Sequence, residues 1–302
     1  MSLLVVGSVA FDSVKTPFGE VEEALGGSAM YFSLSAGFFN DVKLVAVVGE
    51  DFPEEEIAFL NSRNVDTAGL QRVEGKTFRW KGEYSYELNE AHTLETHLNV
   101  FEKFSPEITD SYRDSHYVFL GNIDPELQLA VLKQVKDPQF VGLDTMNFWI
   151  ERKREALLEV LKQVDILTIN DGEARQLTEE VNLIKAAQKI SSYGPRILII
   201  KRGEYGALMF NGTKIFSAPA YPLEAVFDPT GAGDSFAGGL MGYLCNIQNL
   251  NDETLRRSII FGSVMASFNV EDFSMNRMRK LTYPEIEKRF KMFKELTHFE
   301  DI

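Results

Sequence analysis

Short apolar runs alternate with longer stretches of mixed polarity along most of the chain. A run of about four to eight apolar residues, bounded by glycine or polar residues, is typical of a β-strand that is buried on both faces of a parallel sheet. Apolar residues spaced three or four apart predict the connecting helices. We therefore predict an α/β fold with a mainly parallel sheet. Its strands are predicted at Leu3–Val9, Leu44–Val48, Tyr117–Leu120, Phe140–Leu143, Ile166–Ile169 and Ile197–Ile200.

Helices are predicted where the apolar residues gather on one face. Two of them begin at Gly26-Gly27-Ser28 and at Ala232, and the others occupy Phe52–Leu60, Glu253–Phe268 and Pro284–Phe293. Asn211-Gly212 joins two further apolar segments, and this dipeptide is typical of a type I′ turn in a β-hairpin. The chain shows no repeat and no linker between independent domains, which favours one domain with an insertion.

The alternation of strands and helices is interrupted at Thr77–Leu88. There apolar and polar residues alternate one by one, with Phe78, Tyr84 and Tyr86 on the apolar face. A period of two without intervening helices predicts a small antiparallel sheet with one covered face. Phe11–Leu25 is also predicted to be extended, with a turn near its middle.

The segment Asp228–Gly239, with the sequence DPTGAGDSFAGG, carries the most distinctive chemistry. Its glycines at 231 and 233 let the backbone turn tightly at the start of a predicted helix, where unpaired N–H groups and the helix dipole bind anions. A carboxylate such as Asp234 is repelled by an anion bound beside it. Its position makes sense if it acts as a general base that removes a proton from the attacking nucleophile. We therefore hypothesise phosphoryl transfer to a hydroxyl, with Asp234 as the general base.

Two other interpretations of this segment remain open. A glycine-rich turn can be only a tight connection, and an aspartate in a first helical turn can be only a partner of the helix dipole. A nucleophilic Ser235 would need the Gly-x-Ser-x-Gly spacing of hydrolases, and the sequence misses that spacing by one residue.

Polar residues follow five of the predicted strands. Asp12 comes shortly after the first strand, and Asn122, Asp144, Asn170 and Lys201 follow four later ones. Because ligands of open parallel sheets bind outside the carboxyl ends of the strands, this series predicts one polar ledge. Polar residues are also ordinary turn formers, so each residue alone is uninformative.

Composition limits the classes of function. A formal net charge of −14 over 302 residues argues against general nucleic-acid or membrane-surface binding. Cys245 is the only cysteine, which excludes an internal disulfide, and the four histidines lack metal-ligand spacing, so we predict no zinc site. The N-terminal apolar run is too short to span a membrane and has no basic leader, so we expect a cytoplasmic protein.

Several motifs together resemble a known family. Residues 228–236 resemble the C-terminal signature of the ribokinase-like (PfkB) carbohydrate kinases, and Gly26-Gly27 resembles their N-terminal double glycine. Asn170-Asp171-Gly172-Glu173 is similar to their Asn-x-x-Glu motif, and Lys201-Arg202-Gly203 with Gly206 to their nucleotide-side strand and turn. The resemblance implies a three-layer α/β/α domain over residues 1–302, with a discontinuous β-sheet lid from about residues 11–25 and 75–100.

The resemblance also implies an activity. Family members use ATP and Mg²⁺ to phosphorylate a hydroxyl, usually a primary alcohol, on a small sugar, a sugar derivative or a nucleoside. By position, Asp234 would be the base, and Gly231, Ala232 and Gly233 would form the anion hole. Glu173 would orient Mg²⁺ through water, which neutralises phosphate charge beside an acidic protein.

Three further sets of residues are expected from the resemblance. The acceptor-binding residues would be Asp12, Gly26, Gly27, Tyr31 and Asn122. The nucleotide-binding residues would be Asn170, Lys201, Arg202, Gly203, Gly206 and Ser263. The residues Asp228 and Thr230 resemble a loop that binds a monovalent cation such as K⁺ in several relatives.

The chain departs from the family where a sugar would bind. Many sugar kinases carry an asparagine four residues after the double glycine and another just before the first aspartate, and here those positions hold Tyr31 and Ala10. Fewer polar contacts and more aromatic surface, with Phe11 or Phe148 nearby, fit either a less hydroxylated acceptor or a stacked nucleoside base. Tyr31 could instead only pack within its helix.

We therefore predict a kinase of a small sugar or sugar derivative. The alternatives are a nucleoside kinase of the same fold and, behind it, a non-catalytic ligand-binding or regulatory protein. The last would be expected to have lost the base or the anion-hole glycines, and this chain keeps both. Arg79 on the lid is a candidate contact for a phosphate on the acceptor. The apolar face of the lid sheet is compatible with homodimerisation through the lid, and equally with closure over the active site.

Overall fold

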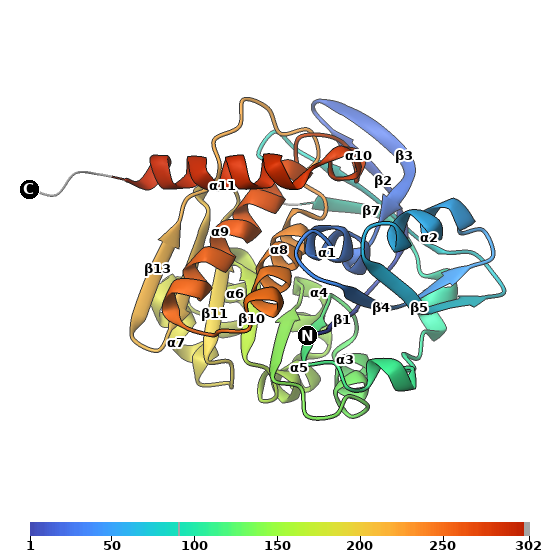
Figure 1. The fold of residues 1–302 in the computed structure, drawn as a ribbon, viewed down its shortest axis with the longest axis horizontal. Helices are drawn as coiled ribbons and strands as arrows, with labels where there is room; N and C mark the ends of the chain where they lie inside the picture. Colours follow the sequence, from blue (N-terminus) through green and yellow to red (C-terminus); the bar gives the residue numbers. More distant parts are fainter. Residues whose placement is uncertain (90, 299–302) are drawn as a thin grey trace, which may run out of the picture.

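A nine-stranded sheet forms the centre of the computed structural model, which describes residues 1–89 and 91–298 (Figure 1). Its order is β13-β12-β11-β10-β9-β8-β1-β4-β5; the strands from β11 to β5 are parallel, and the hairpin β12–β13 adds an antiparallel edge. The strands are β1 Leu3–Val6, β4 Val42–Gly49, β5 Val65–Val73, β8 Tyr117–Leu120, β9 Phe140–Asp144, β10 Ile166–Asn170, β11 Ile197–Lys201, β12 Ala207–Asn211 and β13 Lys214–Ala218.

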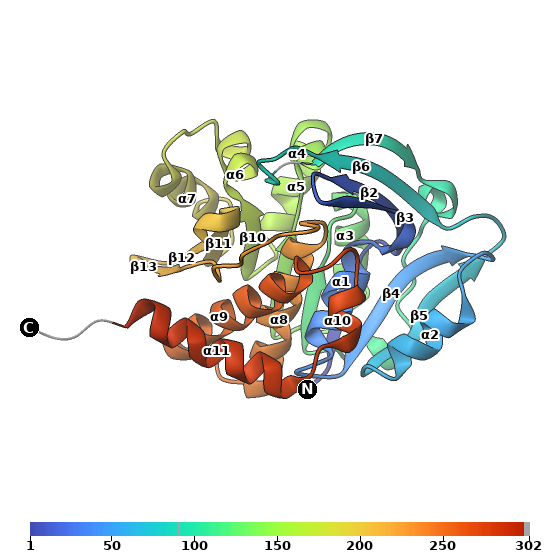
Figure 2. The same cartoon turned by 90° about the horizontal axis from the view of Figure 1, so that it is seen from above.

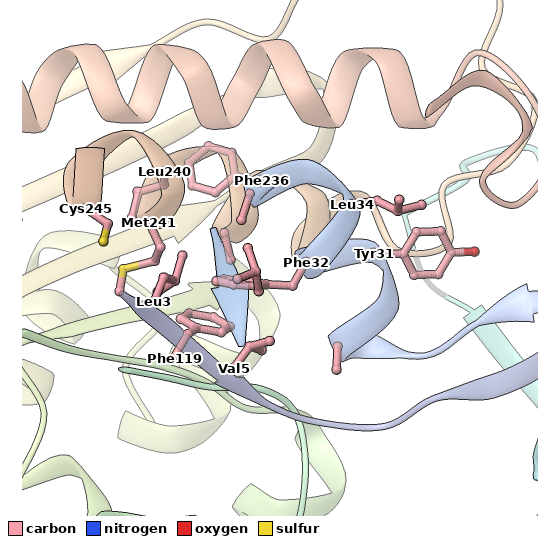
Figure 3. Packing of buried hydrophobic residues seen from close by; sticks show 14 of the residues in the cluster. Leu3, Val5, Tyr31, Phe32, Leu34, Phe119, Phe236, Leu240, Met241 and Cys245 are labelled. Carbon is pink, nitrogen blue, oxygen red and sulfur yellow. The ribbon is translucent and has the colours of Figure 1, made fainter. Parts of the chain in front are cut away.

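Strand β1 illustrates why apolar runs form the centre of this sheet. Successive side chains of a strand point to opposite faces, so Leu3 and Val5 enter one core while Leu4 and Val6 enter another. All four are fully buried. In the first core, Phe32 stacks on Phe119 with ring centroids 4.4 Å apart (Figure 3).

Helices cover both faces of the sheet and give the three-layer α/β/α architecture that the sequence predicts. Helices α1, α2, α8 and α9 contribute to the first core, and α3 to α7 to the second. Helices α10 and α11 pack outside α9. The helices are α1 Ser28–Ala36, α2 Glu54–Asn61, α3 Pro125–Leu132, α4 Asn147–Arg152, α5 Arg154–Leu161, α6 Asp171–Thr178, α7 Leu183–Ser191, α8 Ala232–Ile247, α9 Asp252–Asn269, α10 Asn276–Lys280 and α11 Tyr283–Thr297. Short 3₁₀ turns lie at η1 Asn99–Lys103, η2 Asp110–Tyr112 and η3 Gly203–Tyr205.

A second sheet of four strands stands beside the carboxyl ends of β1 and β5 (Figure 2). Its order is β3-β2-β6-β7, and its strands are β2 Ala10–Thr16, β3 Gly19–Gly26, β6 Phe78–Tyr84 and β7 Ala91–His97. The alternation predicted an antiparallel sheet. This is only partly correct, because β2 and β6 pair in parallel. These two strands follow the parallel strands β1 and β5, and therefore enter the second sheet in the same direction.

The one-by-one alternation also ends earlier than predicted. The register of β6 against β7 shifts between Lys81 and Gly82, and β6 ends at Tyr84. Tyr86, predicted on the covered face, lies beyond the strand with 88% of its surface exposed. Glu90, within the lid segment expected at 75–100, lies outside the described residues. Among the residues that are described, no helix is both long and apolar enough to cross a membrane.

Candidate active site

The Asp228–Gly239 segment forms a tight turn that leads directly into α8. Gly231 precedes the helix with φ 73°, a left-handed conformation that favours glycine. A Cβ atom at this position would lie 2.3 Å from the ring of Tyr31, so a side chain is excluded on two grounds. Asp234 lies in the first turn of α8, at the helix N-terminus. There the N–H of Ala232 donates to the carbonyl of Pro229 at 3.2 Å.

Buried side chains hold this turn in place. Asn269, at the end of α9, is fully buried; its amide nitrogen donates to the carbonyl of Thr230 at 2.8 Å, and its amide oxygen accepts from the Ser235 hydroxyl at 3.1 Å. The carboxylate of Asp228 accepts from the backbone N–H groups of Thr230 and Ser274, each at 2.9 Å. Asn269 and Ser274 were not predicted from the sequence, and together these contacts make the turn rigid.

The surroundings of Asp234 suit a general base. The pKa of its carboxyl is raised to about 7, because burial and the nearby Asp144 carboxylate together outweigh the lowering by the Lys201 ammonium. The residue as a whole is only partly buried. A carboxyl with a pKa near neutrality is a stronger proton acceptor than an ordinary aspartate and is still ionised in a useful fraction at pH 7.

Lys201 supplies local positive charge in an otherwise acidic protein. Its ammonium is 2.8 Å from Asp144 Oδ2, and a Cβ added to Gly233 would lie 2.9 Å from the same nitrogen. Although burial lowers the pKa of Lys201, the carboxylates of Asp144 and Glu173 raise it on balance. The ammonium therefore stays protonated beside the anion-binding turn. From its position in the sequence Asp144 is predicted on the polar ledge, but its contact with Lys201 is not.

Asn170 and Glu173 form a reciprocal capping box at the start of α6. Glu173 N donates to Asn170 Oδ1 at 2.7 Å, and Asn170 N donates to Glu173 Oε2 at 2.9 Å. The pKa of Glu173 is raised to about 7, because burial outweighs the lowering by the Lys201 ammonium. Asn170 also pairs with Lys201 across β10 and β11, so these residues meet at one edge of the sheet. Glu173 Oε1 stays available to a ligand.

Asp12 lies at the start of the second sheet, only 5% exposed. The pKa of its carboxyl is raised to about 7, because burial and the nearby carboxylates of Asp228 and Asp234 outweigh the lowering by a backbone hydrogen bond from Gly27. A Cβ at Gly26 would lie 1.8 Å from Asp12 Oδ2, so the glycine makes room for this carboxylate. Gly27 has φ 94°, and a side chain there would collide with the carbonyl of Ser8.

Asn122 lies beyond β8 and is joined to an aromatic pair. Its Oδ1 accepts from Trp149 Nε1 at 2.9 Å. Phe148 meets Trp149 edge to face, with ring centroids 4.9 Å apart, and half of its surface is exposed. An exposed aromatic surface therefore lies beside a predicted acceptor-binding residue.

The second sheet contacts both sides of this site. The Thr230 hydroxyl donates to the hydroxyl of Tyr84 at 3.2 Å, and a Cβ at Gly203 would lie 2.4 Å from Asn89 Oδ1. Sequence analysis placed Tyr84 on the apolar face of its strand and did not identify it as part of the site. Arg79 binds Glu23 of β3 at 2.8 Å and Asp51, which lies between β4 and α2, at 2.9 Å. Its contact with a phosphate on the acceptor stays a prediction.

The nucleotide-side residues divide into two groups. Arg202, Gly203 and Gly206 form the turn after β11, where Arg202 N donates to the Gly206 carbonyl at 2.8 Å. Ser263 lies apart from them in α9 with 8% of its surface exposed, and within the described residues its hydroxyl bonds to no other member of the predicted site. Across residues 1–89 and 91–298, no three His, Cys, Asp or Glu side chains are arranged to hold a metal directly.

An anion-binding helix N-terminus with a carboxylate in its first turn and a lysine beside it is the arrangement of a phosphotransferase with an alcohol acceptor. The family model described as pfkB family carbohydrate kinase matches residues 3–280. The chain therefore belongs to the pfkB family of carbohydrate kinases.

Similar proteins include kinases of nucleosides. The chain is 32% identical to a cytidine kinase of Thermococcus kodakarensis over 251 residues, 80% of this chain and 88% of the relative. It is 27% identical to a nucleoside kinase of Methanocaldococcus jannaschii over 172 residues, 56% of this chain and 53% of the relative.

Solved structures share the fold. The nucleoside kinase of M. jannaschii superposes with a TM-score of 0.75 at 19% identity, covering 96% of this chain and 98% of the other. A putative ribokinase II from E. coli, in complex with ATP and Mg²⁺, gives 0.78 at 18% identity, covering 96% and 99%.

Proposed function

We propose that this kinase transfers the γ-phosphate of ATP to the primary hydroxyl of a nucleoside. The observation that carries this acceptor class is that a buried carboxylate, Asp12, and a half-exposed aromatic ring, Phe148, both follow the carboxyl ends of parallel strands in the same sheet. A carboxylate accepts hydrogen bonds from sugar hydroxyls, and an aromatic surface stacks on a base. The 32% identity to a cytidine kinase supports the same class.

The reaction follows from the site. The acceptor hydroxyl gives its proton to Asp234 as its oxygen attacks the γ-phosphorus. A new O–P bond forms, the bond from the γ-phosphorus to the β,γ-bridging oxygen breaks, and ADP leaves with the electron pair. The amides of Gly231 and Gly233 and the Lys201 ammonium hold the negative charge of the transferred group, and the Ala232 N–H would join them only by giving up its 3.2 Å bond to the Pro229 carbonyl.

The Asn170–Glu173 capping box fits an indirect magnesium site. One carboxylate oxygen of Glu173 is held by Asn170 N, and the other can accept from water in the coordination shell of the ion. When bound, Mg²⁺ neutralises charge on the phosphates. At Asp228, both carboxylate oxygens already accept backbone N–H bonds, so this side chain braces the loop and we derive no step through K⁺.

The acceptor class is tested by ADP release with ATP and Mg²⁺ against cytidine, other nucleosides, ribose and fructose. We expect turnover on a ribonucleoside at lower concentrations than on either free sugar. Fructose is a matched alternative, because the chain is 30% identical to a probable fructokinase-3 of Arabidopsis thaliana over 70% of its length. Turnover on fructose or ribose alone would refute the nucleoside assignment.

Homodimerisation through the lid fits the exposure of β7, all seven residues of which are exposed. An unpaired outer strand can pair with a second copy. Light scattering at micromolar concentration tests this, and we expect Leu94→Lys to convert a dimer into a monomer. A monomeric wild-type protein would refute it.

A further inference from the structure

Asn269 bridges the two ends of the turn that carries Asp234. Its amide nitrogen donates to the carbonyl of Thr230 at 2.8 Å, and its amide oxygen accepts from the Ser235 hydroxyl at 3.1 Å. Thr230 immediately precedes residues 231–234, and Ser235 immediately follows them. One fully buried side chain at the end of α9 therefore fixes the turn on both sides.

The loop before this turn, which resembles a K⁺-binding loop, already has donors on its oxygens. Asp228 Oδ1 accepts from the N–H of Thr230 and Asp228 Oδ2 from the N–H of Ser274, each at 2.9 Å. The Thr230 carbonyl accepts from Asn269. Three oxygens that a cation in this loop would use are therefore each bonded to an N–H group of the protein.

These donors oppose the binding of a cation. A K⁺ ion is held by oxygen atoms that replace its hydration shell. Here an ion beside the same oxygens would lie against the partial positive charge of the N–H groups. The Asn269 amide cannot be reversed, because the Thr230 carbonyl can only accept a hydrogen bond. The N–H groups also stabilise the buried Asp228 carboxylate: burial raises its pKa, and the hydrogen bonds from Ser274 and Thr230 oppose that rise.

We propose that Asn269 is a positioning residue that takes the place of a monovalent cation, so that phosphoryl transfer by this chain requires neither K⁺ nor Na⁺. The inference rests on the proposed role of residues 231–234 in phosphoryl transfer, and it holds for any acceptor. A bound cation would tie this loop together through its oxygens. Asn269 ties it through a neutral amide that belongs to the chain, so the rate should not depend on which salt is present.

The first test compares wild-type enzyme in KCl, NaCl and tetramethylammonium chloride at equal ionic strength, with ATP and Mg²⁺ supplied free of K⁺ and Na⁺ and with any acceptor that the enzyme phosphorylates. Tetramethylammonium controls for ionic strength, because its methyl groups keep oxygen ligands away from its charge. We expect kcat to agree within about twofold in the three salts. The melting temperature of the ligand-free protein should also be the same in the three salts, because an ion that binds the folded protein would raise it.

Asn269→Asp replaces the donor by an acceptor of nearly the same size. A carboxylate oxygen then faces the Thr230 carbonyl, and two acceptors repel each other. In tetramethylammonium chloride we expect kcat to fall by about tenfold or more, because the turn is displaced. A cation can bridge the new carboxylate and the carbonyl, so K⁺ or Na⁺ should restore part of the activity and raise the melting temperature of this variant.

Asn40→Asp is the matched control. The Asn40 amide nitrogen also donates to a backbone carbonyl, that of Met1, at 3.0 Å. Met1 precedes the amino end of β1, whereas the site lies at the carboxyl ends of the strands. This variant should melt at a lower temperature, keep wild-type kcat and show no response to K⁺.

Three results would overturn the inference. The first is a wild-type kcat that is higher in KCl than in tetramethylammonium chloride by more than the expected range. The second is a rise in the wild-type melting temperature that is specific to K⁺ or Na⁺. The third is a folded Asn269→Asp variant that either keeps wild-type kcat in all three salts or loses activity that no cation restores.

Two further outcomes separate this inference from the proposed function. If Asn269→Asp does not fold, the comparison of salts with wild-type enzyme decides the inference. If wild-type enzyme phosphorylates no acceptor, the proposed function fails, and the melting temperatures in the three salts still decide whether the loop binds a cation.

Discussion

Asp12→Asn should make the ligand-free protein more stable while weakening acceptor binding. The carboxyl is 5% exposed, and its pKa in the folded protein is about 7 against 3.8 for the ordinary group. Because the folded-state pKa is raised, the folded protein binds more protons than the unfolded chain between about pH 4 and pH 7. The free energy of unfolding therefore falls as pH rises through that window, and asparagine removes this loss.

The size of the effect follows from the two pKa values. When the folded and unfolded pKa values differ by one, the free energy of unfolding changes by about 1.4 kcal/mol. The ionised Asp12 carboxylate therefore lowers the free energy of unfolding by up to about 4 kcal/mol at pH 8. At pH 5, where the folded carboxyl is protonated, the cost is less than half as large. The stabilisation by Asp12→Asn should therefore grow by roughly 2–3 kcal/mol between these pH values.

Urea unfolding of the ligand-free protein at pH 5 to 8 measures this difference. Asp110→Asn is the control, since 97% of that side chain is exposed and it should change little at any pH. Asp12→Asn should also raise the KM of the acceptor. If Asp12→Asn and wild type are equally stable at all pH values, the Asp12 carboxylate is solvated. If the variant is less stable than wild type at pH 8, the carboxylate is structurally required.

Four further outcomes follow from the site. The kcat/KM should fall as pH drops through about 7, because Asp234 acts in its ionised form; a flat profile from pH 8 to 5.5 would contradict this. Asp144→Asn should lower kcat by about tenfold or more with little change in acceptor KM, since Lys201 loses its 2.8 Å partner; single-turnover kinetics test it. Asn269→Ala should destabilise the protein by about 2–3 kcal/mol in urea, because it breaks two buried hydrogen bonds. Gly231→Ala should abolish turnover, because the left-handed φ of 73° and the nearby Tyr31 ring leave no room for a side chain. Wild-type activity in Asn269→Ala or Gly231→Ala would show that the turn need not be rigid.

The sequence predicts those parts of the fold that depend on local patterns. Strands such as β1 and β10 are recognisable as apolar runs because both of their faces are buried. Strand β5 was missed because it lies at the edge of the sheet, and only Val65 and Gly69 are buried in it. The parallel pairing of β2 with β6 depends on the direction of β1 and β5, which no local pattern records.

The same distinction holds for the site. The turn at residues 231–234 is contiguous, so its glycines and Asp234 could be identified directly. Asn269 contacts Ser235 across 34 positions, and Asp144 meets Lys201 across 57, so their roles appear only when α8 packs on α9 and β9 to β11 align. Among the described residues the Tyr31 hydroxyl has no hydrogen-bond partner, and this too follows from packing alone.

The central claim is that Asp234 removes a proton from a nucleoside hydroxyl during phosphoryl transfer. The most direct measurement is formation of nucleoside monophosphate from ATP and cytidine by wild type and by Asp234→Asn, with ATP affinity measured in parallel. We predict product with wild type, a loss in kcat of about 10²–10⁴-fold or more in the variant, and unchanged ATP binding. Turnover that survives the substitution, or a loss of ATP binding equal to the loss of turnover, would contradict the assignment of Asp234 as the base.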